Sequence, residues 1–247
     1  MGTTTDGPDA TAPVVAVVGA SGGLGSEIAR SLHRRGAHLV LAGRDRGRLD
    51  AVGVPAEAVV ALDVRDPTAG DALAAAVLAG PGRLDGYVNA AGVVAFGDLA
   101  DTEDVVVEEL FLTNVIGPIW LLRRVAPLLA RTRGTAVHLS AVVADTPLPG
   151  MAAYSASKAA LTAADRALAR ELRRQGVRLV DVRPPHTETG LAGRPLAGTA
   201  PRLPTGLEPG DVADLVVAEL LDGRGTELPP AAFGAGPAGD PGRAPEG

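Results

Sequence analysis

Short apolar runs alternate with longer amphipathic segments along most of the chain. The apolar runs predict strands at 14–18, 38–42, 59–62, 86–89, 136–140 and 177–182. Between them, hydrophobic positions recur every three or four residues. This spacing predicts helices through about 28–35, 67–78, 102–129 and 153–175, the third interrupted near Gly117-Pro118. Strands that alternate with helices form βαβ units, so we expect an α/β fold, a doubly wound parallel sheet of six to seven strands with helices on both faces.

The pattern contains no internal repeat and no linker that would divide it. We expect one domain over residues 13–233, with a polar tail before it (1–12) and a Gly- and Pro-rich tail after it (234–247), both disordered. Residues 189–209 are also rich in Gly and Pro and predict a mobile substrate loop. The last expected strand is poor, because the segment 227–230 is short and ends in two prolines.

Composition narrows the class of protein. The 23 Lys and Arg against 29 Asp and Glu give a net charge of −6 without a basic cluster, which argues against nucleic acid or an anionic membrane as a partner. There is no cysteine, and the four histidines (33, 38, 138 and 186) show no ligand spacing, so we expect no disulfide, thiolate nucleophile or metal site. No signal-peptide core and no apolar run near the ~18 residues of a membrane span occurs, so we expect a soluble, cytoplasmic protein.

A glycine-rich turn follows the first predicted strand. Gly19-x-x-x-Gly23-x-Gly25, which also contains Ser21 and Leu24, leads directly into the first predicted helix. Glycines allow a tight turn and a close approach of a pyrophosphate to the amides of a helix N-terminus. The spacing departs from the general Gly-x-Gly-x-x-Gly fingerprint, so a plain turn is the alternative. The position after the first strand favours a nucleotide.

The only lysine of the chain, Lys158, lies four residues after Tyr154. Arginine is the cation everywhere else, which indicates that this position needs a compact ammonium. Residues four apart share one face of a helix. An ammonium beside the phenol favours phenolate and lowers the tyrosine pKa from about 10, as a general acid/base near neutral pH requires. A chance pair on a solvated helix face is the alternative.

The second predicted strand ends in Ala42-Gly43-Arg44, where NAD-specific sites carry an acidic residue for the ribose hydroxyls. An arginine there can instead bind a 2′-phosphate, which favours NADP over NAD as the cofactor. Asp45 adjoins Arg44 and weakens this inference. A solvated arginine in a turn is the alternative.

Together these features resemble the classical short-chain dehydrogenase/reductase (SDR) family from about residue 14 to residue 221. Asn89-Ala90-Ala-Gly92 is similar to the Asn-Asn-Ala-Gly segment of that family, and Asn114 falls where it keeps a catalytic asparagine. The chain has no further asparagine. Asp63-Val64 resembles the segment that contacts adenine. The segment 184–189 resembles the Pro-Gly segment after strand six, whose final threonine holds the nicotinamide carboxamide, with Pro185 in place of the glycine.

The resemblance implies a Rossmann-type fold and hydride transfer between NADP(H) and a small or medium ketone or secondary alcohol. Tyr154 would exchange a proton with the substrate oxygen. Lys158 would lower the tyrosine pKa and hold the nicotinamide ribose, and Asn114 would position a water that relays protons to Lys158. The implied cofactor-binding residues are Gly19, Ser21, Gly23, Leu24, Gly25, Arg44, Asp63, Val64, Asn89, Ala90, Gly92, Tyr154, Lys158, Pro184, Thr187 and Thr189.

One position departs from the catalytic pattern of the family. The family has a serine about thirteen residues before the tyrosine, but here that position is Ala141, and Ser140 precedes it. Neighbouring strand residues point to opposite faces, so Ser140 would need a one-residue bulge to replace it. We favour a structural Ser140. His186 and Thr146 are the candidates for a replacement donor, and for His186 the alternative is a packed loop residue. The alternatives are a cofactor-binding protein with little redox turnover, or a non-redox lyase or isomerase that uses Tyr154.

The helix predicted over 153–175 carries alanine at 156, 159, 160, 163, 164 and 167, so one face has little side-chain bulk. In the resembling family this helix and the one that bears Asn114 pair across a two-fold axis. The resemblance therefore implies a homodimer or homotetramer. The poor last strand favours the dimer. The alternative is that the alanines only pack against the protein's own core.

Overall fold

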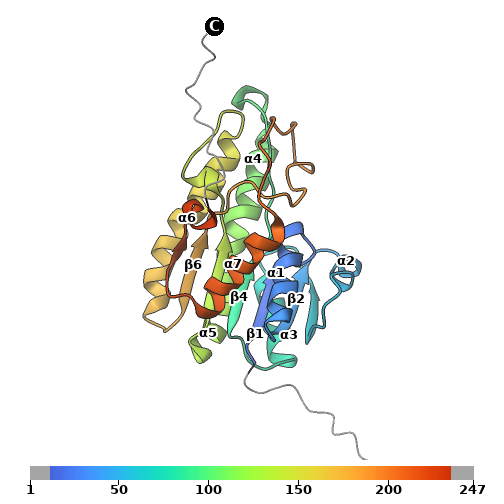
Figure 1. Ribbon diagram of the computed structural model, residues 1–247, viewed down its shortest axis with the longest axis vertical. Coiled ribbons are helices and arrows are strands. Elements are labelled where there is room, and N and C mark those ends of the chain that lie inside the picture. Colours follow the sequence, from blue (N-terminus) through green and yellow to red (C-terminus); the bar gives the residue numbers. More distant parts are fainter. Residues whose placement is uncertain (1–11, 235–247) are drawn as a thin grey trace, which may run out of the picture.

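The computed structural model of the protein describes residues 12–234, which form one seven-stranded sheet in the order β3-β2-β1-β4-β5-β6-β7 (Figure 1). All neighbouring strands are parallel. The strands are β1 Val14–Val18, β2 His38–Gly43, β3 Ala58–Ala61, β4 Gly86–Asn89, β5 Thr135–Leu139, β6 Arg178–Val182 and β7 Glu227–Leu228. The predicted doubly wound sheet is confirmed. Apart from residues 12 and 234, the two expected tails lie outside the described residues.

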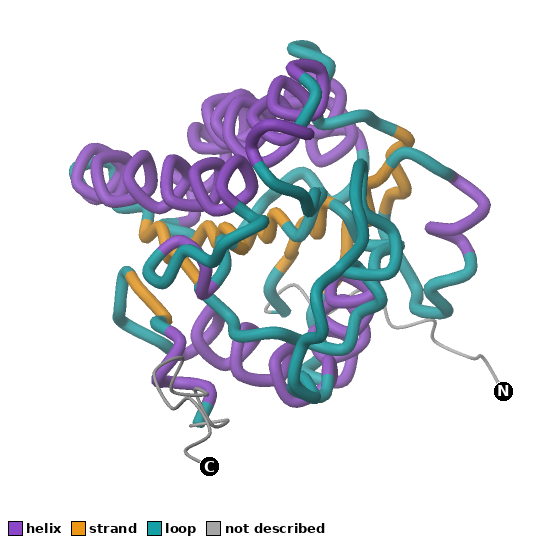
Figure 2. Tube along the Cα trace, turned by 90° about the horizontal axis from the view of Figure 1, so that it is seen from above, coloured by secondary structure: helices purple, strands orange, loops and turns teal. Residues whose placement is uncertain are grey.

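Helices cover both faces of the sheet (Figures 1 and 2). α1 (Gly23–Arg34) and α7 (Pro209–Asp222) pack on one face, and α3 (Ala69–Ala79), α5 (Gly117–Thr132) and α6 (Ala152–Arg173) pack on the other. α2 (Arg46–Asp50) is a short helix after β2, and α4 (Asp104–Phe111) precedes α5. Single 3-10 turns occupy Leu99–Asp101, Val142–Ala144 and Pro230–Phe233.

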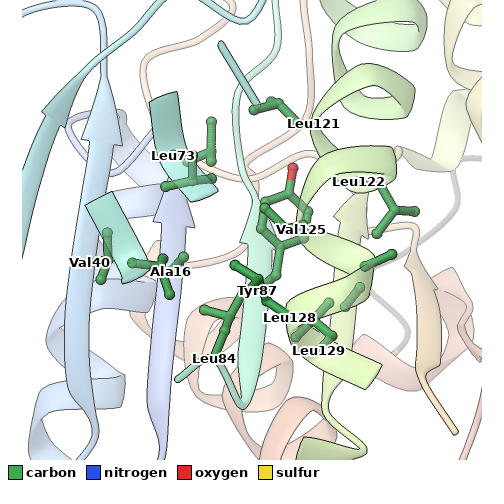
Figure 3. Close-up of a cluster of buried hydrophobic side chains, with 14 of the residues drawn as sticks. Ala16, Val40, Leu73, Leu84, Tyr87, Leu121, Leu122, Val125, Leu128 and Leu129 are labelled. Atoms are coloured by element: carbon green, nitrogen blue, oxygen red, sulfur yellow. The ribbon is translucent and has the colours of Figure 1, made fainter. Parts of the chain in front are cut away.

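Two apolar cores join these layers. Side chains alternate across a strand, so the even-numbered residues of β1 face α3 and α5 while the odd-numbered ones face α1 and α7. Both faces of the central strands are therefore buried, which explains their continuous apolar runs. Figure 3 shows part of the first core, in which side chains of α3 and α5 lie over the sheet: Leu73, Leu121, Val125 and Leu129 over Ala16, Val40 and Tyr87.

The long helix expected over 102–129 does not break at Gly117-Pro118. Instead one wider π turn, Leu112–Ile116, joins α4 to α5 and contains Asn114. Pro118 has no N–H, so the Asn114 carbonyl lacks the donor that an α-helix supplies four residues later. The turn widens, and Gly117 donates to the carbonyl of Leu112, five residues back.

The helical stretch Asp104–Thr132 is long and apolar enough to cross a membrane by length and composition alone. Half of its most apolar window is buried inside the fold, however, and α5 packs on the sheet. A buried core helix has this same composition, so the stretch is only a weak indication of a membrane span.

Two C-terminal features bear on the expectations from sequence. The edge strand β7 forms, but it is two residues long and pairs only with Asp181 and Val182 of β6.

Residues 189–208 form no helix or regular strand, and Pro209 begins α7. This loop is anchored by backbone hydrogen bonds from Leu196 to Val94 (2.8 Å) and from Phe96 to Ala197 (3.0 Å). Its mobility stays a prediction.

Candidate active site

A cavity of about 680 Å³ lies beyond the carboxyl ends of the central strands, from the turn after β2 to α6 and the segment after β6. Gly25, Asn89 and Asn114 do not line it but contact residues that do. The other residues expected at the site line the cavity: Gly19, Ser21, Gly23, Leu24, Arg44, Asp63, Val64, Ala90, Gly92, Ser140, Tyr154, Lys158, Pro184, Thr187 and Thr189.

The glycine turn brings the N-terminus of α1 to the cavity wall. Among the described residues, no side chain caps this helix and no acidic residue lies in its first turn, so no anionic side chain competes for its first amides. Gly19 has a φ of +76°, and a Cβ there would lie 2.6 Å from the Ala91 nitrogen. A Cβ on Gly25 would lie 2.1 Å from the Gly19 carbonyl oxygen. Gly25 therefore allows close packing and does not reach the cavity.

Two arginines line the far end of the cavity. Arg44 follows β2, and within residues 12–234 its guanidinium makes no hydrogen bond or ion pair. Arg48, which the sequence reasoning missed, lies one turn further on and donates to the Ser21 carbonyl (3.0 Å). Asp45 caps α2 by accepting from the Arg48 backbone N–H (3.0 Å). The acid beside Arg44 thus has a structural role, and the Arg44 charge stays available.

Asp63, expected to contact adenine, is held by Arg65. The Arg65 guanidinium donates to both carboxylate oxygens of Asp63 and pairs with Glu109 of α4 at 2.7 Å. Hydrogen bonds from Arg65 are the main reason why the pKa of Asp63 is lowered. Arg65 is a second arginine at the cavity that the sequence reasoning missed.

Asn89 and Asn114 are both fully buried and hold the segment after β4. The Asn89 side chain accepts from the Ala91 N–H (3.2 Å). The Asn114 amide accepts from Val93 N–H and donates to the Val93 carbonyl (both 2.9 Å), and it also donates to Ser157 Oγ (3.1 Å). These bonds fix the β4 segment against α6, so the Asn114 side chain positions backbone around Lys158.

Tyr154 and Lys158 lie one turn apart on α6, and both are buried at the cavity. Lys158 Nζ donates to the Leu139 carbonyl at the end of β5 (2.9 Å). Burial lowers the pKa of Lys158 to about 8, against the opposing charges of Asp181 and Asp165. Burial raises the pKa of Tyr154 above its usual range, so the lowered value expected from sequence is not met. The lost hydration of the phenol outweighs an ammonium that is directed at Leu139.

Ser140 and Ala141 lie side by side after β5. Ser140 Oγ is 2.8 Å from Thr162 Oγ1 on α6, and its N–H donates to the Val182 carbonyl, which continues the regular β5–β6 pairing. Ala141 follows in extended backbone (φ −171°, ψ 160°) and lines the cavity. This geometry supports the interpretation in which Ser140 is structural and Ala141 takes the position of the usual serine.

The segment after β6 closes the cavity over the glycine turn. A Cβ on Gly23 would lie 2.4 Å from the Thr189 carbonyl oxygen, so this segment and the turn are in direct contact. Thr187 Oγ1 donates to the Pro185 carbonyl (2.9 Å). His186 lines the cavity, with its Nε2 3.5 Å from Glu188 Oε1. Thr146, the other candidate donor, is exposed and does not line the cavity.

The wall around Tyr154 is mainly apolar. Several residues that line the cavity belong to the same apolar cluster as Tyr154, among them Val94, Phe96, Val143, Met151, Leu191 and Ala192. Within residues 12–234, no group of three or more His, Cys, Asp or Glu residues could hold a metal ion. This end of the cavity suits a neutral, partly apolar molecule, with the Tyr154 hydroxyl as a polar contact.

Comparisons with known proteins agree with this geometry. The family model of short chain dehydrogenases matches residues 13–197. Dehydrogenase/reductase SDR family member 7B of Danio rerio is 31% identical over 226 residues, which cover 83% of this chain and 73% of that protein. An uncharacterized oxidoreductase of Staphylococcus epidermidis is 32% identical over 212 residues, which cover 84% of this chain and 90% of that protein.

Solved structures show the same likeness. A short-chain dehydrogenase from Streptomyces avermitilis has a TM-score of 0.79 at 29% identity, over 90% of this chain and 88% of that one. An alcohol dehydrogenase from the archaeon Thermococcus sibiricus, complexed with 5-hydroxy-NADP, has a TM-score of 0.78 at 28% identity, over 87% of this chain and 94% of that one. With the family model matched over most of its described length, the chain belongs to the short-chain dehydrogenase family of oxidoreductases.

Proposed function

We propose that the protein is an NADP(H)-dependent oxidoreductase that transfers hydride between the cofactor and a small or medium ketone or secondary alcohol. The observation that carries this proposal is the arrangement of one cavity. Tyr154 and Lys158 line one end, Arg44 and Arg48 line the other, and the uncapped N-terminus of α1 lies between them. An acid/base group, a phosphate-binding turn and two cations are thus spaced along one cavity, as a phosphorylated dinucleotide requires.

The residues of this cavity fit NADP. Gly22 and Gly23 line the cavity at the uncapped N-terminus of α1, which suits a pyrophosphate, and Arg44 and Arg48 suit a 2′-phosphate. When bound, the cofactor supplies a nicotinamide carbon that gives or accepts hydride. The Thermococcus alcohol dehydrogenase, 28% identical to this chain, is complexed with 5-hydroxy-NADP, which favours the same choice.

Tyr154 carries the proton in this proposal. In reduction, the phenol donates its proton to the carbonyl oxygen as the carbonyl carbon is reduced, and the ammonium of Lys158 stabilises the phenolate that forms. In oxidation, the phenolate accepts the hydroxyl proton of the alcohol. Because burial raises the pKa of Tyr154, the neutral phenol predominates at neutral pH. The form of Tyr154 that donates a proton in reduction is therefore the one present near pH 7.

Ala141 removes one donor to the substrate oxygen. Loss of such a donor costs on the order of 10²–10³ in rate. His186 lines the cavity and Thr146 does not, so His186 is the better candidate for a replacement donor. We therefore expect slow turnover, with Tyr154 as the main polar contact of the substrate oxygen.

NADPH consumption with a panel of ketones tests the proposal. We expect turnover by the unmodified protein and a loss of about 10²-fold or more for Tyr154→Phe, which removes the proton donor. Ala141→Ser should raise the rate by about 10²- to 10³-fold, because it adds a donor to the substrate oxygen. No turnover by the unmodified protein, with recovery in Ala141→Ser, would reject the plain dehydrogenase.

The second candidate is a cofactor-binding protein with little redox turnover, and the Ala141 methyl at the cavity is the observation that favours it. Calorimetry with NADPH separates the two candidates. Tight binding without consumption of NADPH by any ketone would support the binding protein. Binding together with consumption supports the enzyme.

A further inference from the structure

A row of polar side chains crosses the sheet just below Tyr154 and Lys158. Asn89, His138, Asp181 and Glu227 are direct register partners on β4, β5, β6 and β7. His138 and Asp181 lie on neighbouring central strands and are 0% and 1% exposed. Ionisable groups are costly in such a dry position unless partners compensate for their charge.

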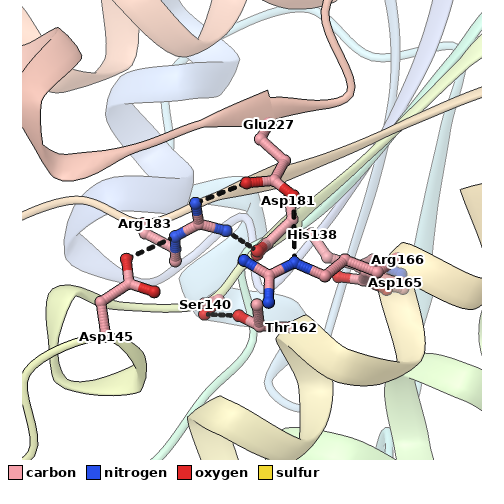
Figure 4. Close-up of polar contacts among 9 residues, drawn as sticks. All are labelled: His138, Ser140, Asp145, Thr162, Asp165, Arg166, Asp181, Arg183 and Glu227. Atoms are coloured by element: carbon pink, nitrogen blue, oxygen red, sulfur yellow. Dashed lines mark hydrogen bonds and ion pairs between the residues drawn. The ribbon is translucent and has the colours of Figure 1, made fainter.

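Helix α6 places a line of polar side chains over this row. Tyr154, Lys158 and Asp165 follow one another at spacings of four and seven residues, so they share one face of the helix. Lys158 donates to the Leu139 carbonyl of β5, and Asp165 Oδ1 is 2.7 Å from His138 Nδ1 of the same strand (Figure 4). Asp165 is 1% exposed. Lys158 and Asp165 are therefore buried against β5 along a single stripe.

Arg183 holds the second buried carboxylate. Its guanidinium contacts Asp181 and also pairs with Asp145 (2.8 Å) and Glu227 (2.7 Å) at the surface (Figure 4). The cation is thus shared among three carboxylates, of which Asp181 alone is fully buried. Within residues 12–234, Asp165 Oδ2 and Asp181 Oδ1 have no hydrogen-bond partner. Arg183 and, when protonated, His138 are the cations in contact with these two buried carboxylates.

The charges that act on Lys158 come from Asp165 on α6 and Asp181 on β6, which are in turn contacted by His138 on β5 and by Arg183 on β6. We propose that Asp165 and Asp181 are positioning residues that act through Lys158. Their buried carboxylates keep its ammonium charged and set the pH range in which it can stabilise the Tyr154 phenolate. This last role rests on the proposed function.

The physical reason is the weak screening of charges inside a protein. A buried lysine without a counter-charge gives up its proton, with a pKa that falls to about 5–6. Burial lowers the pKa of Lys158 only to about 8, because the charges of Asp181 and Asp165 oppose the effect of burial. Arg183 in turn opposes the raised pKa of Asp181, which burial and the charge of Asp165 produce.

Because the chain has a single lysine, the effect of the two carboxylates on Lys158 can be measured without an activity assay. Protein made with lysine labelled by carbon-13 at Cε, with a lysine-free tag, gives one side-chain signal, and its shift against pH reports the Lys158 midpoint. We expect a midpoint near pH 8 in the unmodified protein. Asp181→Asn and Asp165→Asn should each lower it by about one pH unit.

Asp145→Asn is the matched control. It makes the same chemical change and removes a partner of the same arginine, but the Asp145 side chain is 39% exposed. It should leave the Lys158 midpoint in place, and thermal unfolding checks that each variant is folded. Unchanged midpoints in folded Asp181→Asn and Asp165→Asn would overturn the proposal.

If neither variant folds, the Lys158 midpoint of the unmodified protein is the test. A midpoint near pH 8 supports the counter-charge, while a midpoint of about 6 or below is that of a buried lysine without one and would overturn it. Activity is a separate readout. If the two variants shift the Lys158 midpoint as expected but the protein turns over no ketone, the proposed function is rejected and the role of the two carboxylates stands.

Discussion

Lys158 combines a chemical role with an unfavourable environment. Its pKa is 10.5 in the unfolded chain and about 8 in the fold. Between these values the unfolded chain holds a proton that the folded protein lacks. The free energy of unfolding therefore rises as the pH increases from about 8 to 10.5. This added stability is lost again as the pH falls back through about 8. At neutral pH Lys158 is charged in both states, and its burial lowers the free energy of unfolding by the full amount.

Lys158→Met should stabilise the protein at pH 7, because methionine fills a similar volume without a charge. The pKa change corresponds to about 3 kcal/mol, and the loss of the hydrogen bond to the Leu139 carbonyl offsets part of this, so we expect a gain of about 1–2 kcal/mol. Urea unfolding at pH 7 and pH 9.5 measures it. The unmodified protein should gain stability between these two values, and the variant should gain less. Equal stability of the two proteins at pH 7 would contradict this account of Lys158.

Arg44 should decide the choice of cofactor. Arg44→Asp puts a negative charge where the 2′-phosphate is expected and offers an acceptor to the ribose hydroxyls. We expect NADP affinity to fall by about 10- to 100-fold and the preference to reverse toward NAD. Calorimetry at fixed salt measures both affinities. Arg46→Asp, a change of charge two residues away but outside the cavity wall, is the control. Equal affinities for both cofactors in the unmodified protein would count against the inference.

Sequence reasoning predicted some of these residues but not others. Tyr154, Lys158, Arg44 and Ala141 were predictable because each belongs to a local motif with fixed spacing. Arg48 and Arg65 line the cavity only because their turns fold back toward it. The row of His138 and Asp181 depends on the register between strands that are distant in sequence. A lone buried histidine or aspartate gives no such signal along the chain.

The junction of α4 and α5 depends on a glycine. A Cβ on Gly117 would lie 2.5 Å from the Val64 carbonyl oxygen. Gly117→Ala must therefore shift backbone, and we expect a loss of about 1–3 kcal/mol. Gly210→Ala in α7 has open space and should gain up to about 1 kcal/mol from helix propensity. Denaturant unfolding compares the two, and equal stabilities would contradict the close approach at Gly117.

The elements themselves were largely predictable. Each of the six strands expected from sequence starts and ends within one residue of its position in the structure. For the central strands the reason is that a strand buried on both faces is one uninterrupted apolar run. The helix expected over 153–175 is α6, Ala152–Arg173. The π turn was not predictable, since it depends on the contact of Gly117 with Val64 as well as on Pro118. The two-residue β7 depends on its pairing with β6.

At the level of the whole molecule, we propose that two copies pair through α6. Ala156, Ala163 and Ala167 are exposed on this helix, and Ile116 beside Asn114 is 38% exposed. We expect a homodimer by light scattering at micromolar concentration. Ala163→Arg should give a monomer of 24.8 kDa, because its side chain prevents the close approach of a partner helix.

Ala75→Arg is the control for this assembly. It makes the same change at an exposed alanine of α3, away from α6, and should leave the dimer intact. A monomer in the unmodified protein would reject the interface outright.

The central claim is that this cavity transfers hydride from NADPH to a ketone. The most direct measurement uses NADPH with deuterium at the transferable position of the nicotinamide, a ketone that the protein consumes, and mass spectrometry of the product. We expect an alcohol with deuterium on its carbinol carbon from the unmodified protein, and about 10²-fold less of it from Tyr154→Phe. Bound NADPH that no ketone consumes, or a product without deuterium, would contradict it.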